Sequence, residues 1–105
     1  MTPEKVVQNS IRLYCGQHNI LCFRCNVGKV QLATGGYFDT GLPEGFSDLI
    51  ILPGNGIIIF CEVKAPKGHQ RQDQIKFQQS VESRGYKYIL AHSLEEFILE
   101  LKKTR

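Results

Sequence analysis

The sequence of 105 residues lacks the features that mark several classes of protein. It has no apolar run near the roughly 18 residues that a membrane-spanning helix needs, and its first residues lack the apolar core of a signal peptide. It shows no internal repeat, no low-complexity tract and no linker. We therefore expect a single domain over residues 1–105, no contact with a membrane and a cytoplasmic location.

The four cysteines do not form a pattern typical of a metal or redox site. Cys22 and Cys25 have CxxC spacing, but no second CxxC follows. The segment that contains them reads as a strand, and a spacing of three along a strand puts the two thiols on opposite faces. Reduced, partly buried thiols in a cytosolic protein are the favoured reading.

The net charge of +3 is mild and permits nucleic-acid binding without establishing it. The cations are clustered, however, and several fall between positions 64 and 76. These are Lys64, Lys67, His69, Arg71 and Lys76. They either form a solvated helix face or contact phosphate groups.

Local patterns predict the element order α-β-β-β-α-β-α. The first helix begins at Thr2 as N-cap with Pro3 at its first position, and runs to about residue 18. A helix over about 70–84 and a strand over 86–91 follow later, and an amphipathic stripe predicts a short last helix. Antiparallel hairpin strands and a parallel strand–helix–strand crossover together give an α/β fold with a mixed sheet flanked by helices.

Residues 20–25 read as a strand, 26–28 as a turn and 29–33 as the partner strand. Arg24, Asn26 and Lys29 would then surround the tip of this hairpin, either as ordinary turn and solvated residues or as phosphate contacts. The Gly-rich stretch 34–45 that follows is predicted to be a long loop. Its Tyr37 or Phe38 either stacks on a base or packs beneath the loop.

The most informative stretch runs from Gly45 to Lys64. Two apolar, β-branched runs flank a turn cluster at 53–56, which is typical of a β-hairpin at the centre of a sheet. Asp48 and Glu62 nevertheless lie near the outer ends of these strands, and Lys64 follows two residues later. Because buried charges on strands are costly unless they are paired or bind a metal, this is where function is expected.

The register of the hairpin decides whether the two carboxylates meet. Glu62 and Lys64 share a face because side chains alternate along a strand. A three-residue connection, or an equivalent bulge, places Asp48 opposite Glu62, whereas a two-residue turn places it opposite Cys61. We predict the first arrangement. Carboxylates with Cβ atoms about 5 Å apart repel each other, and a hard divalent cation such as Mg²⁺ relieves that repulsion.

Asp48 followed by Glu62-Val63-Lys64 resembles the PD-(D/E)xK nuclease motif. The finer resemblance is to the VRR-NUC family, the virus-type replication-repair nucleases, in their small stand-alone phage and bacterial form. The usual proline before the aspartate is Ser47 here. The matching positions are Glu4, Arg24, Asn26, Gly28, Gly41-Leu42-Pro43, Gly45-Phe46-Ser47-Asp48-Leu49, Glu62-Val63-Lys64 and Gln74.

This resemblance implies a restriction-endonuclease-like fold and a Mg²⁺- or Mn²⁺-dependent DNA endonuclease. Asp48, Glu62 and the Val63 carbonyl would hold the metal, and Lys64 would act on the nucleophile or on the charge of the transition state. The family implies branched DNA, such as flaps or four-way junctions, as substrate. It also implies a homodimer, a helicase or replication protein as partner, and a bacterial or phage-infected host cell.

The resemblance adds assisting roles for Glu4 and Gln74. Glu4 either is an acid favoured by the dipole of the first helix or reaches the metal site directly or through water. Gln74 lies among apolar neighbours on its helix and needs a hydrogen-bond partner. It either bonds sheet backbone or a neighbour, or orients Lys64, a ligand or the water. The predicted nucleic-acid contacts are Arg24, Asn26, Lys29, Lys67, His69 and Arg71.

Two other classes remain open on the sequence. A non-catalytic nucleic-acid-binding module would keep the fold and the basic segment without needing the complete set of site residues. A structural or inhibitor protein would carry its acidic pair by coincidence, and would bind neither divalent metal nor DNA.

Overall fold

The computed structural model describes residues 1–104 and contains three helices and six strands among them. Five strands precede the second helix, not the three that the sequence patterns predicted. Among the described residues, no helix is both long and apolar enough to cross a membrane. The elements are α1 (Pro3–Gln17), β1 (Leu21–Arg24), β2 (Lys29–Gln31), β3 (Tyr37–Asp39), β4 (Leu49–Gly54), β5 (Ile57–Val63), α2 (Gln72–Glu82), β6 (Lys87–Ala91) and α3 (Leu94–Lys103).

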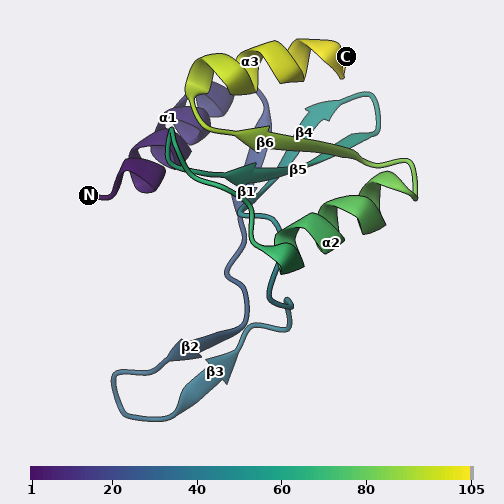
Figure 1. Cartoon of the computed structure of the whole chain (residues 1–105). Helices are drawn as coiled ribbons and strands as arrows, with labels where there is room; N and C mark the ends of the chain where they lie inside the picture. The colour runs from purple at the N-terminus through teal and green to yellow at the C-terminus, as the bar shows by residue number, and fades with distance from the viewer. Residues whose placement is uncertain (105) are drawn as a thin grey trace.

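The main sheet has the strand order β1-β4-β5-β6. β4 pairs antiparallel with both β1 and β5, whereas β5 and β6 are parallel. α1 and α3 lie on one side of this sheet and α2 on the other (Figure 1). The predicted mixed sheet flanked by helices is therefore confirmed.

The first helix begins where the sequence indicated. The Thr2 hydroxyl accepts a hydrogen bond from the Lys5 amide at 3.2 Å, and Pro3 occupies the first turn. The apolar stripe of α1 then packs on the sheet, with Ile11 fully buried. These are the usual means by which a short sequence fixes a helix start and orients its buried face.

Alternation along the strands gives the main sheet two different faces. On the face towards α1 and α3, which we call the inner face, Ile59 and Cys61 of β5 are fully buried in the core. The opposite face, which we call the α2 face, carries Phe60 and Glu62 of the same strand. Phe77 of α2 packs against Phe60 with ring centroids 5.5 Å apart. The α2 face thus combines an aromatic cluster with a buried carboxylate.

The β4–β5 hairpin confirms the predicted register through a bulge. Its turn has two residues, Asn55 and Gly56, whose φ values of +58° and +75° suit a type I′ turn. The pairing then shifts by one residue between Ile51 and Gly54, and Leu49 pairs with Cys61. Continuing that register by one residue sets Asp48 opposite Glu62.

The predicted pairing of residues 20–25 with 29–33 is wrong. β1 pairs with β4, and β2 pairs with β3 in a separate two-stranded sheet. Gly28, at φ +68°, turns the chain away after β1, and its amide bonds the Leu42 carbonyl at 2.7 Å. We call β2, β3 and their connection the arm (residues 29–39). It extends away from the main sheet, and the predicted long loop contains its second strand (Figure 1).

Gly45 is required where the chain enters β4. Its φ is +90°, and a Cβ atom there would lie 2.6 Å from the backbone oxygen of Asp73 in the first turn of α2. Gly85 has a similar φ of +87° but has open space around it. The two glycines therefore separate the cost of backbone conformation from the cost of a clash.

We predict that Gly45→Ala lowers the free energy of unfolding by more than about 2 kcal/mol, because strain and a backbone clash add. Gly85→Ala should lower it by only about 1 kcal/mol, from conformation alone. Urea denaturation followed by circular dichroism measures both. Equal losses for the two variants would contradict the close packing of Gly45 on α2.

Candidate metal-binding and catalytic site

Three charged side chains of the motif meet where β4 begins and β5 ends. The Asp48 carboxylate oxygen Oδ2 accepts a hydrogen bond from the Val63 amide at 2.8 Å. The Lys64 Nζ lies 3.6 Å from Glu62 Oε2. Glu62 is only 1% exposed and Lys64 only 7%. The sequence prediction that Glu62 and Lys64 share one face is confirmed, and the strand framework holds both in place.

Gln74 connects the first turn of α2 to this group. Its Oε1 accepts from the Arg71 amide at 2.8 Å, and its Nε2 donates to Glu62 Oε2 at 2.7 Å. Because a backbone amide can only donate, the side-chain oxygen of Gln74 must face Arg71 and its NH₂ group must face Glu62. Of the alternatives considered for Gln74, the structure supports a contact with the predicted ligand Glu62.

One oxygen of Glu62 has no partner. Its Oε1 is buried and accepts no hydrogen bond. Burial, followed by the negative charge of Asp48, raises the pKa of Glu62 to about 8, although the Lys64 ammonium acts in the opposite direction. A carboxylate in this position lacks one favourable interaction that a cation would supply.

The residues present fit a hard divalent cation. Within residues 1–104, no group of three or more His, Cys, Asp or Glu side chains converges to hold a metal ion. Asp48 and Glu62 are the two carboxylates at this position, and one or two carboxylates completed by other oxygens is the usual ligand set for Mg²⁺. The Val63 amide is used by Asp48, and its carbonyl as a further ligand stays a prediction.

Glu4 lies at the edge of the site and does not complete such a group. It is half-buried in the first turn of α1, and its charge makes a small contribution to raising the pKa of Glu62. It lines an open groove of about 480 Å³ together with neighbouring residues of α1 and Ala65, which follows Lys64. Contact of Glu4 with a metal, directly or through water, stays a prediction.

The predicted phosphate contacts fall into two groups. Exposed Lys67, His69 and Arg71 lie on the segment that joins Lys64 to α2. This segment is held by His92, whose Nε2 lies 3.0 Å from the Gly68 carbonyl oxygen. These basic side chains follow Lys64 closely in the sequence. They are therefore the predicted contacts for phosphate groups next to the site.

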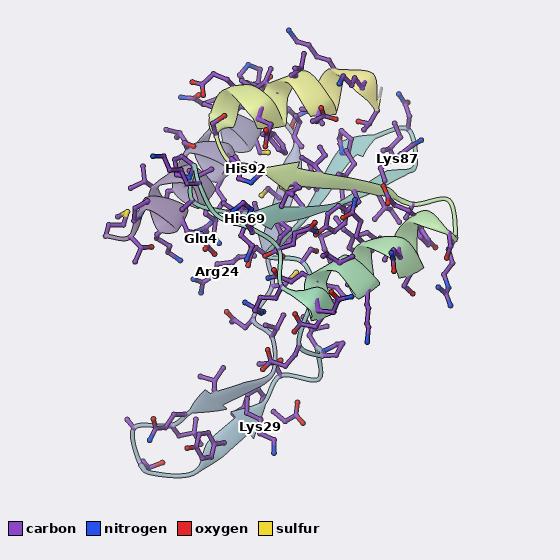
Figure 2. All side chains as sticks on the ribbon, viewed as in Figure 1. Glu4, Arg24, Lys29, His69, Lys87 and His92 are labelled. Carbon is purple, nitrogen blue, oxygen red and sulfur yellow. The ribbon has the colours of Figure 1, made fainter. Side chains whose placement is uncertain are left out.

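The second group, around the expected hairpin tip, is not brought together. Arg24 ends β1, and the next residue, Cys25, donates its amide to the Asp48 carbonyl at 2.8 Å. Lys29 lies on the arm, paired with Asp39, far from Glu4 and His69 in the view of Figure 2. Exposed Asn26 lies between β1 and the arm. The reason is that β1 pairs with β4 and not with β2, so these three residues do not belong to one hairpin.

The sequence interpretation missed Tyr88 as a neighbour of the site. Burial, and next the charge of Glu62, raise the pKa of Tyr88 above its ordinary value. The Tyr88 hydroxyl accepts a hydrogen bond from Gln70 Nε2 at 3.1 Å. Alternation along β6 shows which side chains share a face with Tyr88. Only the parallel pairing with β5 sets Tyr88 beside Phe60, which lies two positions before Glu62 on the same strand.

The raised pKa of Glu62 predicts how stability depends on pH. Because the pKa is near 8 in the folded protein and 4.5 for an ordinary glutamate, this group favours folding fully below about pH 4.5 and loses that contribution as the pH rises through about 8. In EDTA at pH 9, Glu62→Gln should be more stable than the wild type by at least about 1 kcal/mol. At pH 4 the two should be nearly equal.

Thermal unfolding at pH 4 and pH 9 measures this difference, with exposed Glu82→Gln as the control. Mg²⁺ added at pH 9 should raise the melting temperature of the wild type and of the control but not that of Glu62→Gln. If the melting temperature of Glu62→Gln changes with pH as that of the wild type does, Glu62 carries no uncompensated charge in the folded protein at pH 9.

The comparisons with known proteins identify the fold. Neither a protein-family model nor a curated protein sequence matches this chain. A solved structure described as "VRR_NUC domain" superposes with a TM-score of 0.74 at 18% sequence identity, and the match covers 100% of both chains. The chain therefore has the fold of a VRR_NUC domain over its full length, which is the fold that the resemblance of its motif predicted.

Proposed function

We propose that this protein is a divalent-metal-dependent endonuclease that hydrolyses phosphodiester bonds in DNA. The observation that carries the proposal is the buried Glu62 carboxylate, which has one oxygen without a partner and lies beside Asp48 and Lys64. The VRR_NUC fold and the order of the motif residues support the same assignment.

Each residue of the site has a role in this proposal. Asp48, Glu62 and the Val63 carbonyl hold Mg²⁺ or Mn²⁺, which when bound polarises the scissile phosphate and lowers the pKa of its water. Lys64, with its ammonium 3.6 Å from Glu62, positions the attacking water or stabilises negative charge that develops on the phosphate. Gln74 fixes the Glu62 carboxylate through its 2.7 Å hydrogen bond.

The substrate we propose is branched DNA, namely a flap or a four-way junction. Exposed Lys67, His69 and Arg71 beside the site provide phosphate contacts. Residues 1–104 form one such site, so paired cuts in a junction require two copies, and we propose that the protein acts as a homodimer. A helicase or replication protein as partner, in the cytoplasm of a bacterium or a phage-infected cell, belongs to the same proposal.

Cleavage of a panel of labelled DNAs tests the proposal. The panel contains single strand, duplex, splayed arm, 5′ flap, 3′ flap and four-way junction, each with Mg²⁺, Mn²⁺ or EDTA. We expect metal-dependent cutting by the wild type and a loss of at least about 100-fold in Lys64→Ala, with DNA binding retained. Lys87→Ala is the matched control, because Lys87 lies at the far end of the sheet from Glu4 and His69 (Figure 2).

The outcomes separate the classes of function. Cutting that is lost in Lys64→Ala and kept in Lys87→Ala supports the nuclease, and the best substrate then defines its role. Salt-sensitive binding without cutting of any DNA would instead indicate a non-catalytic nucleic-acid-binding module. Neither cutting nor binding would overturn both assignments and leave the fold alone.

A further inference from the structure

Two cysteines meet where α1 packs on the edge strand β1. Cys15 lies near the end of α1 and is fully buried. Cys22 pairs with Ile51 of β4, so its side chain lies on the inner face of the sheet. There it packs against the core cluster that contains Cys15. The two thiols are free, and they form a hydrogen bond with each other.

The turn between α1 and β1 brings these two cysteines together. The Ile20 amide donates to the Cys15 carbonyl at 2.9 Å across Asn19, which has a φ of +56°. This is the helix ending of a Schellman motif, and it returns the chain at once along the last turn of the helix. Cα atoms of α1 and β1 consequently approach within 8 Å of each other. A disulfide joins cysteines whose Cα atoms lie within about 7 Å, so a small movement of the helix end is sufficient.

The CxxC spacing of Cys22 and Cys25 does not define this pair. Three residues of extended chain separate their Cα atoms by about 10 Å, which is too far for a disulfide. Cys61 lies on β5, and β4 separates it from β1, so it is again about 10 Å from Cys22. Cys15 is therefore the partner that the tertiary fold supplies to Cys22.

The two paired thiols differ in reactivity. The hydrogen bond from Cys15 lowers the pKa of Cys22, burial acts in the opposite direction, and the Arg12 guanidinium lowers that pKa further. The same hydrogen bond, and next burial, raise the pKa of Cys15. Cys22 is also half-buried on an edge strand, where a small molecule can reach it. Because the thiolate is the nucleophile, Cys22 is the thiol that reacts first.

The other two cysteines provide an internal comparison. Cys25 is half-buried like Cys22, but burial, and next the charge of Asp48, raise its pKa. Cys61 is fully buried, and burial raises its pKa as well. Of the four thiols, all within the described residues, only that of Cys22 has surroundings that favour the thiolate.

We propose that Cys22 and Cys15 are a redox-active pair, in which a peroxide oxidises Cys22 and Cys15 converts the product into an intramolecular disulfide. With hydrogen peroxide, the Cys22 sulfur attacks one oxygen and the O–O bond breaks, which gives a sulfenic acid and one water. The Cys15 sulfur then attacks the Cys22 sulfur, an S–S bond forms, the S–O bond breaks, and the oxygen leaves as a second water with the Cys15 proton. Two thiols are oxidised and one peroxide is reduced. The crosslink ties the end of α1 to the edge of the sheet, and it depends on no step of the proposed nuclease reaction.

Peptide mapping after oxidation tests the pair. The reduced protein is treated with an equimolar amount of hydrogen peroxide, unfolded, alkylated with iodoacetamide and digested with trypsin. Cleavage after Arg12 and Arg24 releases residues 13–24 with both paired cysteines, whereas Cys25 and Cys61 fall on separate peptides. We expect the peptide 13–24 to lose two hydrogen atoms and to stay unalkylated, and dithiothreitol to restore both alkylation sites. The peptides with Cys25 and Cys61 should be alkylated throughout.

Alkylation of the folded protein without peroxide tests which thiol reacts first. Iodoacetamide at pH 7 should modify Cys22 at least about 10-fold faster than Cys25, because more of Cys22 is thiolate. Arg12→Gln should slow the reaction of Cys22, and Arg12→Lys, which keeps the positive charge, should leave it nearly unchanged. Cys15→Ser should stop the reaction with peroxide at the sulfenic acid of Cys22, which dimedone traps.

Three results would overturn the inference: a peptide 13–24 that is still fully alkylated after peroxide, a disulfide between Cys22 and Cys25, or alkylation of Cys22 no faster than that of Cys25. The first two are measured on the wild type, so they hold even if Cys15→Ser fails to fold. Because neither metal nor DNA is present, a protein without nuclease activity can still form the disulfide, and an active nuclease can fail to form it.

Discussion

The buried carboxylate of Glu62 is the constraint around which this fold is arranged. A charge with 1% exposure is tolerated only if its surroundings supply partners. Gln74 and Lys64 both reach Oε2, while Oε1 remains without a partner. The backbone of the next residue, Val63, simultaneously fixes Asp48. Removing Gln74 or Lys64 would leave the negative charge of Glu62 less compensated, so the end of β5 and the start of α2 depend on each other.

Two packing details make that arrangement attainable. A bulge in the β4–β5 hairpin brings Asp48 into register with Glu62 while still allowing a two-residue Asn55-Gly56 turn. Gly45 lets the chain approach the backbone of Asp73 closely, which holds the first turn of α2 against the entry to β4. Gln74 belongs to that same turn. The position of its side-chain amide therefore depends on the close contact of Gly45 with the Asp73 backbone.

The molecule divides into a body with a packed inner face and an arm that contacts no other helix or strand among residues 1–104. The body alone accounts for the site. One side of the arm, with Val30 and Phe38, and the exposed face of β1, with Leu21 and Phe23, are apolar and lie outside the core that α1 and α3 cover. Exposed apolar surfaces of this kind are more typical of an interface than of an isolated domain.

The sequence by itself determined the local elements and the motif: the start of α1, the hairpin from Gly45 to Lys64, the shared face of Glu62 and Lys64, and the mixed sheet. Alternation, turn residues and capping are local signals, so they can be read from neighbours in the chain. Only the tertiary structure decided that β1 pairs with β4 and so separates Arg24 from Lys29. It also brought Tyr88 beside the site through parallel pairing. Pairing between strands that are distant in sequence depends on how their buried faces pack together in the core. A local sequence pattern contains no information about that packing.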